Sequence, residues 1–457
     1  MKIAFLGGTG TVTGSKYLVT TDSGAQILVD CGLYQGYKWL RRRNWQGIPL
    51  VDPKKLDAIV LTHAHLDHSG YVPVMYKRGF RGPVYCHHAT RDLAGIMLPD
   101  SGHIQEEDAH FYARHKLSRH EKPEPLYDGQ TAMDSLRLLH GINFHQTVTV
   151  KDISFYLQPV GHILGAGSLI LSADGKRVGF SGDVGRQHDI FMYPPEPLPP
   201  LDLLLLESTY GNRFHPNNDP LEEMESVVKE VIEKGGVLLI PSFAVGRAQV
   251  IMYILSLLMD AGRIPRLPVF LDSPMAIDVS EVYCRYPQQH RLDREDCHRV
   301  CNVAKFTRSV HESKAISDQH FPHIIIAGSG MITGGRILHH MRRLLDNYRT
   351  SVLLPGFQAG GTRGDKLLNG AQSIRIHGQW VENRASIHCL TNLSGHGDPA
   401  EIFQWLQQSS LDPKTHIRLV HGEAESLEAM RDYLRQRSDY EVEVAEYREI
   451  LDVSALS

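Results

Sequence analysis

The chain contains 457 residues, of which 42% are hydrophobic and 22% charged, with 26 histidines and a formal net charge of −4. It is too long for one ordinary hydrophobic core, so we expect two or three domains. The slightly negative charge excludes a global basic field, so contact with a polyanion would rely on local positive charge.

The N-terminal segment, Met1 to Gly8, is predicted to be a strand that runs into a glycine turn. It lacks the long apolar core of a signal peptide, and no apolar stretch approaches the roughly 20 residues that cross a bilayer. We therefore expect a cytoplasmic protein without a membrane span. The basic run Arg41-Arg42-Arg43 is interpreted as part of a solvated loop. The cysteines lack paired spacing, so free thiols are expected at Cys31, Cys86, Cys284, Cys297, Cys301 and Cys389.

Short strand-like runs separated by turns fill most of the first two hundred residues. They are residues 3–6, 15–20, 26–29, 58–62, 84–87, 147–157, 168–172 and 177–181. This pattern of short strands favours a sandwich of sheets with helices outside. A polar, helix-prone segment from Asp100 to Lys122 interrupts it, and we expect an excursion over the surface.

A proline-rich segment, residues 193–200, marks a domain boundary. A strand–helix alternation follows, with strands expected at 203–206, 237–240, 269–272, 323–327 and 351–355, and helices at 220–234, 247–260 and 336–347. This alternation predicts a parallel α/β domain. Its interior position indicates an insertion, so we expect a first domain formed by residues 1–200 and 376–457, interrupted by a second domain at 201–375.

The segment His63-Ala64-His65-Leu66-Asp67-His68 places four candidate metal ligands in six residues, directly after a predicted buried strand. Imidazole and carboxylate groups together suit zinc, and less often iron or manganese. Asp30, His162, Asp183 and His421 also fall at the ends of predicted strands or in glycine-rich turns. One sheet edge could therefore gather all of these side chains, whereas a single histidine at a strand end is more often structural.

Taken together, these motifs resemble the metallo-β-lactamase fold. Glu207 in Leu-Glu-Ser-Thr-Tyr-Gly and His396 in Leu-Ser-Gly-His-Gly-Asp resemble motifs of its β-CASP branch, which includes compact prokaryotic RNA-degrading enzymes and the endonuclease subunit of the cleavage and polyadenylation factor. The resemblance spans nearly the whole chain. It implies an α/β fold, namely an αββα metallo-β-lactamase sandwich with an inserted parallel α/β β-CASP domain.

The resemblance also implies two zinc ions, with manganese as an alternative metal. His63, His65 and His162 would hold the first ion, and Asp67, His68 and His421 the second, with Asp183 bridging them. Asp30 resembles the carboxylate that braces the ligand loop. His396 would act as general acid and Glu207 would hydrogen-bond it. For substrate contacts we name Arg247 and Arg363.

The activity implied is hydrolysis of single-stranded RNA, with endonucleolytic and 5′-exonucleolytic modes both open. A DNA nuclease of the same family is the nearest alternative, although a histidine at position 421 resembles the RNA-processing members. A small-molecule hydrolase would not need the long insertion, and a non-catalytic scaffold would have lost ligands that are present here. Since many relatives dimerise, a homodimer is also expected.

Overall fold

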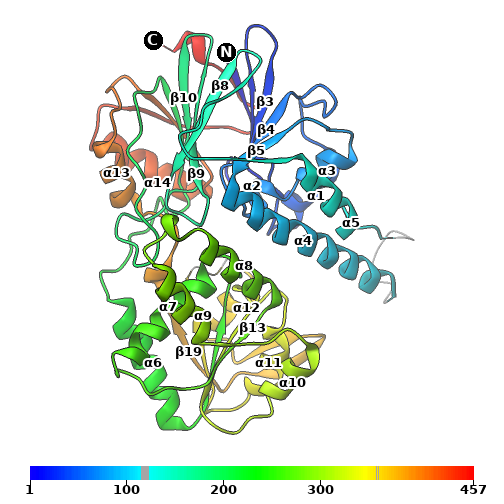
Figure 1. The fold of residues 1–457 in the computed structure, drawn as a ribbon, viewed down its shortest axis with the longest axis vertical. Helices are drawn as coiled ribbons and strands as arrows, with labels where there is room; N and C mark the ends of the chain where they lie inside the picture. The colour runs from blue at the N-terminus through cyan, green and yellow to red at the C-terminus, as the bar shows by residue number, and fades with distance from the viewer. Residues whose placement is uncertain (115–122, 357, 359, 457) are drawn as a thin grey trace. The chain divides into compact units, whose positions relative to one another are not determined.

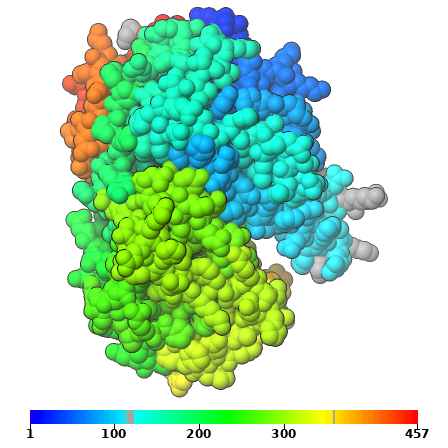
Figure 2. Space-filling model, in the orientation of Figure 1, coloured from blue at the N-terminus to red at the C-terminus, as the bar shows by residue number. Residues whose placement is uncertain are grey.

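The computed structural model describes residues 1–114, 123–356, 358 and 360–456, which are coloured in Figure 1 and Figure 2. These residues form two compact units. The first contains Met1–Phe214 and Gly395–Ser457, and the second contains His215–Ser394. Each unit is described by itself.

Two sheets form the centre of the first unit, each with seven strands among the described residues. The first sheet has the order β22 (Ile450–Asp452), β1 (Lys2–Gly7), β2 (Lys16–Thr20), β3 (Gln26–Val29), β4 (Ala58–Val60), β5 (Val84–His87), β6 (Leu139–Ile142). The second has the order β21 (Glu441–Val444), β20 (His416–Val420), β11 (Leu203–Glu207), β10 (Lys176–Phe180), β9 (Gly167–Ala173), β8 (Ile153–Pro159), β7 (Val148–Val150).

Buried side chains of both sheets share one hydrophobic core. Ile3 and Phe5 of β1 belong to the same buried cluster as Leu169 and Leu171 of β9. Because alternate residues of a strand point to opposite faces, the other face of the first sheet forms a second core. In that core Leu28 and Ile59 lie with residues of the neighbouring helices. The expected sandwich with helices outside is confirmed.

The helices of the first unit lie mainly in the connections between strands (Figure 1). They are α1 (Lys38–Gln46), α2 (Leu66–Ser69), α3 (Val72–Lys77), α4 (His88–Arg114), α5 (Gly129–Ser135), α13 (Pro399–Gln408) and α14 (Ala424–Arg435), with 3₁₀ turns η1 (Leu136–Leu138) and η4 (Val453–Ala455). In the described ranges, no helix combines the length and apolar character that a membrane crossing requires.

The second unit is built on a parallel sheet. Its strand order is β14 (Lys305–Phe306), β13 (Val269–Asp272), β15 (His323–Ala327), β12 (Val237–Pro241), β16 (Ser351–Leu354), β19 (Ser386–Cys389). A separate hairpin pairs β17 (Ser373–Ile376) with β18 (Gln379–Glu382). Parallel neighbours require crossover connections, which explains the intervening helices. The expected inserted α/β domain is confirmed.

The helices of the second unit follow the predicted signals where such signals exist. They are α6 (Pro220–Lys234), α7 (Arg247–Asp260), α8 (Pro274–Arg285), α9 (Arg294–Asn302), α10 (Val310–Ile316), α11 (Ile337–Leu344) and α12 (Arg363–Leu368), with 3₁₀ turns η2 (Pro287–Gln289) and η3 (Thr391–Leu393). Asp219 caps α6 by accepting a hydrogen bond from the Leu221 amide. Gly235 ends α6 in the left-handed conformation, as predicted from Gly235-Gly236.

Both boundaries between the units lie further along the chain than the expected 200/201 and 375/376. Strand β11 pairs in parallel with β10 and β20, so it belongs to the sandwich and the first crossing falls after Phe214. Strand β19 pairs with β16, so it extends the inserted sheet and the return falls after Ser394. The pairing partners of β11 and β19 decide these boundaries, and the composition of a strand alone does not show which sheet it joins.

Two local predictions also need correction. Residues 147–157 form a hairpin, β7 and β8, because Lys151 turns the chain at a φ of 55°. Arg41 to Arg43 lie on helix α1, not in a loop.

The helix-prone character predicted from Asp100 onward is confirmed as far as Arg114. This stretch continues α4, which begins at His88. Residues 115–122 of that prediction lie outside the described residues.

Candidate metal centre

The candidate ligands lie at the ends of neighbouring strands. After β4 the chain continues directly into His63 and His65, and the short helix α2 then presents Asp67 and His68. His162 follows β8, Asp183 follows β10, and His421 follows β20 at a φ of 50°. A rigid sheet edge can thus direct side chains from distant parts of the sequence to one point.

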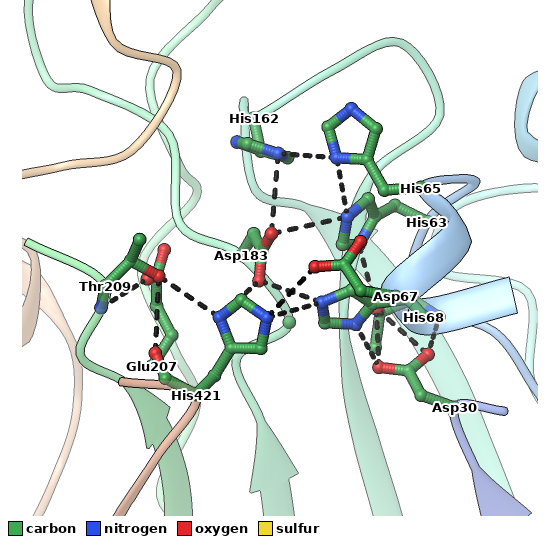
Figure 3. A network of polar contacts seen from close by, with 12 residues as sticks. Asp30, His63, His65, Asp67, His68, His162, Asp183, Glu207, Thr209 and His421 are labelled. Atoms are coloured by element: carbon green, nitrogen blue, oxygen red, sulfur yellow. Dashed lines mark hydrogen bonds and ion pairs between the residues drawn. The ribbon is translucent and has the colours of Figure 1, made fainter. Parts of the chain in front are cut away.

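The first group of ligand atoms surrounds Asp183 Oδ2 (Figure 3). This oxygen lies 3.4 Å from His63 Nε2 and 3.5 Å from His162 Nε2. His65 Nδ1 lies 3.1 Å from His63 Nε2 and 3.2 Å from His162 Nε2. These four side chains are the ones predicted for the first metal ion and the bridge.

The second group lies on the opposite oxygen of the same carboxylate. Asp183 Oδ1 is 3.2 Å from His68 Nε2, which is 3.1 Å from His421 Nε2. His421 Nε2 is in turn 3.5 Å from Asp67 Oδ2. Asp183 therefore reaches one group with each of its oxygens, which is the arrangement of a bridging ligand.

The donor set and its spacing fit divalent metal ions. Tetrahedral zinc with Zn–N distances of about 2.0–2.1 Å separates two nitrogen ligands by about 3.3–3.4 Å, close to the separations found here. Asp183 Oδ1 is buried and accepts no hydrogen bond from any residue that the structure describes. A buried carboxylate oxygen without a donor fits a site for a cation.

The electrostatics of the first group favour neutral imidazole, the form that binds metals. Burial, aided by the nearby His63, lowers the pKa of His65 to about 3. Burial also lowers the pKa of His63, and burial together with the charge of His396 lowers that of His162 well below the usual value. These histidines present lone pairs at neutral pH without competition from protons.

Asp30 contacts the candidate ligand His68 on the side of the ring away from Asp183. Its Oδ2 accepts a 2.7 Å hydrogen bond from His68 Nδ1, so Nε2 of that ring faces Asp183. Thr62 holds the carboxylate in turn, because its amide donates to Oδ1 at 2.8 Å and its hydroxyl reaches both oxygens. Asp30 thus contacts a histidine of the segment that carries the candidate ligands, as the sequence predicted.

His396 lies beside the candidate metal ligands and contacts Glu207. Its Nδ1 is 3.1 Å from Glu207 Oε1, and its ring centroid is 4.5 Å from that of His162. Burial opposes the charged form of His396, but the charge and hydrogen bond of Glu207 prevail and raise its pKa to about 9. The pair thus provides a protonated imidazole within the ligand cluster.

Other contacts at the site carry weaker sequence signals. Thr209 Oγ1 lies 3.1 Å from His421 Nδ1, and the His162 Nδ1–H donates to the Gly395 carbonyl at 2.8 Å. Tyr210 stacks on His396 with ring centroids 6.0 Å apart. Both Thr209 and Tyr210 lie in the Glu-Ser-Thr-Tyr motif, so the sequence could have indicated them. A contact made by a backbone carbonyl, such as that of Gly395, cannot be recognised in the sequence.

The two predicted substrate contacts lie in the second unit and are not part of this cluster. Arg247 is the first residue of α7 and is half-buried. Arg363 Nε donates to the Arg375 carbonyl at 2.7 Å, and its Nη1 donates to the Ile332 carbonyl at 3.0 Å. Much of the Arg363 guanidinium is thus engaged with the backbone.

Known families account for most of the sequence. Residues 9–219 match the metallo-beta-lactamase superfamily, residues 248–367 the Beta-Casp domain, and residues 380–445 the Zn-dependent metallo-hydrolase RNA specificity domain. Ribonuclease TTHA0252 of Thermus thermophilus is 35% identical over 459 residues, which cover 98% of this chain and 99% of the relative. The chain belongs to the β-CASP branch of the metallo-β-lactamase superfamily.

Further relatives support this placement. An RNase J-like protein of Methanocaldococcus jannaschii is 30% identical, with 92% of each chain covered. Transcription termination factor FttA of Methanococcus maripaludis is also 30% identical, over 93% of this chain and 67% of that protein. A solved structure of a protein of unknown function from Enterococcus faecalis V583 shares the fold, with a TM-score of 0.55 at 14% identity over 98% of this chain and 99% of that one. This β-CASP protein is a metal-dependent hydrolase.

Proposed function

We propose that this β-CASP protein is a zinc-dependent ribonuclease that hydrolyses phosphodiester bonds of single-stranded RNA. The proposal rests on the position of Asp183. Each of its two carboxylate oxygens lies beside a separate group of candidate histidine ligands. That arrangement suits two metal ions, with manganese as the alternative to zinc. A relative that aligns along almost its full length is named a ribonuclease, which supports RNA as the substrate.

A pair of bound divalent ions would supply a water nucleophile near neutral pH and would offset negative charge on the phosphate. His63, His65 and His162 would hold one ion, and Asp67, His68 and His421 the other. The protein's part is to keep the two ligand groups fixed relative to one another. The Asp30–His68 hydrogen bond and the shared carboxylate of Asp183 perform that task.

His396 is the residue that we assign as proton donor to the departing ribose 3′-oxygen, which would leave a 5′-phosphate product. Its Nδ1 is committed to Glu207, so the transferred proton would be the one on Nε2. Glu207 is itself held in place, because its Oε1 accepts a 2.6 Å hydrogen bond from the Val184 amide. A fixed, charged donor beside the ligands is the requirement for general acid catalysis.

Arg247 and Arg363 are assigned to RNA phosphate contacts, and a homodimer is the expected assembly. The mode of cleavage, endonucleolytic or from the 5′ end, is left to experiment.

The test is cleavage of one single-stranded RNA, labelled once at its 5′ end and once internally, beside a DNA of the same sequence. We expect chelator-sensitive cleavage of the RNA, with internal fragments for an endonuclease and labelled mononucleotides for a 5′-exonuclease. Cleavage of the DNA alone would replace the proposal with a DNA nuclease. Failure of the zinc-loaded protein to cleave either would refute it.

A further inference from the structure

A polar cavity lies in the first unit, next to helix α1, with a volume of about 170 Å³. None of the residues assigned above to the metal centre lines it. Its lining includes Lys16, Tyr34, Arg43, Tyr71, Tyr447 and Arg448. Lysine and arginine are its charged residues, and no carboxylate belongs to the lining.

Lys16 is the most unusual member of this cavity. It is the first residue of β2 and only 2% exposed. Its Nζ donates to the Gly14 carbonyl at 3.1 Å and lies 4.4 Å from the ring centroid of Tyr34 and 5.2 Å from that of Tyr71. Among the residues that the structure describes, no carboxylate lies within ion-pair distance of this ammonium group. Burial of an ammonium ion without an anion is costly, so the position calls for an explanation.

The local backbone is shaped to place this lysine. Gly14 has a φ of 76°, and a Cβ added there would lie 2.5 Å from Cδ1 of Tyr34. Glycine is therefore required for the Gly14 carbonyl to approach Lys16 beside the Tyr34 ring. Burial lowers the pKa of Lys16 to about 8, and the charge of Arg43 contributes in the same direction. An amine with this pKa is still mainly protonated at neutral pH.

Two arginines add to the positive charge. The Arg43 guanidinium lies 4.0 Å from the ring centroid of Tyr447 and 5.0 Å from that of Trp39, so aromatic rings hold its orientation. Arg448 is the next residue after Tyr447, and its amide donates to the Phe5 carbonyl at 2.8 Å. Within the described part of the chain, neither arginine forms an ion pair with a carboxylate.

We propose that this cavity is a binding site for a dianionic phosphoryl group, as carried by inorganic phosphate or by a nucleoside monophosphate. Lys16, Arg43 and Arg448 provide three positive charges from three separate segments, with donors that suit phosphate oxygens. A phosphate monoester dianion matches this charge better than the single charge of each diester in an RNA backbone. The proposal therefore stands independently of the ribonuclease assignment.

The test is isothermal titration of the full-length zinc-loaded protein, in phosphate-free buffer, with inorganic phosphate and separately with adenosine 5′-monophosphate. We expect saturable binding of at least one of them, and the stronger binder identifies the source of the phosphoryl group. Lys16→Met and Arg43→Gln should each weaken that binding at least tenfold. Arg41→Gln, on the same helix but outside the lining, is the matched control and should bind as the wild type does.

Thermal unfolding gives a second readout that separates this site from phosphate bound at the metal centre. In phosphate-free buffer, Lys16→Met should unfold at a temperature equal to or above that of the wild type, because it removes a buried charge. Added phosphate should raise the unfolding temperature of the wild type more than that of the variant. If Lys16→Met does not fold, Arg43→Gln provides the same test, because its side chain is partly exposed and its replacement should leave the fold intact. Absence of saturable binding, or unchanged binding in the folded variants, would overturn the proposal.

Discussion

Glu207 Oε1 lies 3.1 Å from His396 Nδ1 and accepts a 2.6 Å hydrogen bond from the Val184 amide as well. The carboxylate is fully buried, so its position is fixed by these contacts. Since Asp183 immediately precedes Val184, the same segment positions both the proposed bridging ligand and the partner of the proposed proton donor. This arrangement links the candidate metal site to His396 and leads to separable predictions for the two proposed functions.

His396→Ala should abolish RNA cleavage and leave the metal content unchanged. The imidazole touches the ligand cluster but is not assigned as a ligand, and loss of a general acid costs about 10²-fold or more in rate. Single-turnover cleavage and zinc analysis on the same sample check this. Full activity of the variant would remove His396 from the mechanism, whereas loss of zinc would indicate a ligand role.

Glu207→Gln should lower the cleavage rate and shift its pH profile while His396 remains in place. The charge of Glu207 helps to raise the pKa of His396 to about 9. A protonated donor is needed, so activity is lost as pH rises through that pKa, and removal of the carboxylate charge should move this loss to lower pH. An unchanged alkaline limb would show that His396 does not titrate in the reaction.

Asp67→Ala should lose metal from the second group together with activity. Its Oδ2 lies beside His421 Nε2, and no other carboxylate is assigned to that group apart from the shared Asp183. Zinc content per chain is the measurement, and Asp439→Ala, an exposed carboxylate of the same unit, is the control. Normal zinc content in the Asp67 variant would contradict the ligand assignment.

Asp30→Asn should weaken zinc binding by about 10- to 100-fold, the usual effect of losing a carboxylate that orients a ligand histidine. The substitution keeps the size of the side chain, and asparagine tolerates the φ of 57° found at this position. A competition titration with a zinc chelator gives the affinity. Wild-type affinity would mean that the hydrogen bond to His68 does not tune the site.

Asp272→Asn tests the stability of the second unit. The carboxylate is fully buried and contacts Arg336 Nη1 at 2.6 Å, His340 Nε2 at 2.7 Å and Ser313 Oγ. Removal of one partner from such a buried group costs about 3–5 kcal/mol. Urea unfolding of the second unit should show this loss, with Glu281→Gln, an exposed residue of α8, as control.

The pKa of the Asp272 carboxylate also determines how the stability of the second unit should depend on pH. Burial opposes ionisation of Asp272, but the hydrogen bonds from His340, Ser313 and Arg336 prevail and lower its pKa below the ordinary value. A depressed pKa means that this stabilisation is present above the unfolded-state pKa and is lost as pH falls through the folded-state pKa. Glu281→Gln should keep the acid-induced loss, and Asp272→Asn should reduce it.

Sequence patterns predicted the cluster of candidate ligands because His162, Asp183 and His421 follow a glycine turn or a buried strand, and the histidine-rich segment 63–68 lies shortly after one. Asp183 and His421 are far apart in the chain, yet β10, β11 and β20 are parallel neighbours, so the chain leaves these strands at the same sheet edge. The domain boundaries were less visible, since Leu203–Glu207 and Ser386–Cys389 are assigned to their units by the strands with which they pair. The cavity that contains Lys16, Arg43 and Arg448 could not be predicted from the sequence, because a single lysine in a strand is ordinary until its burial is known.

The most direct test of the two-metal ribonuclease is the zinc content and RNA cleavage of one preparation during stepwise removal and restoration of metal. The active protein should contain two zinc ions per chain. Cleavage should be lost as chelator removes them and should recover when zinc or manganese is returned. Undiminished cleavage of RNA by protein that holds no metal would contradict the two-metal proposal.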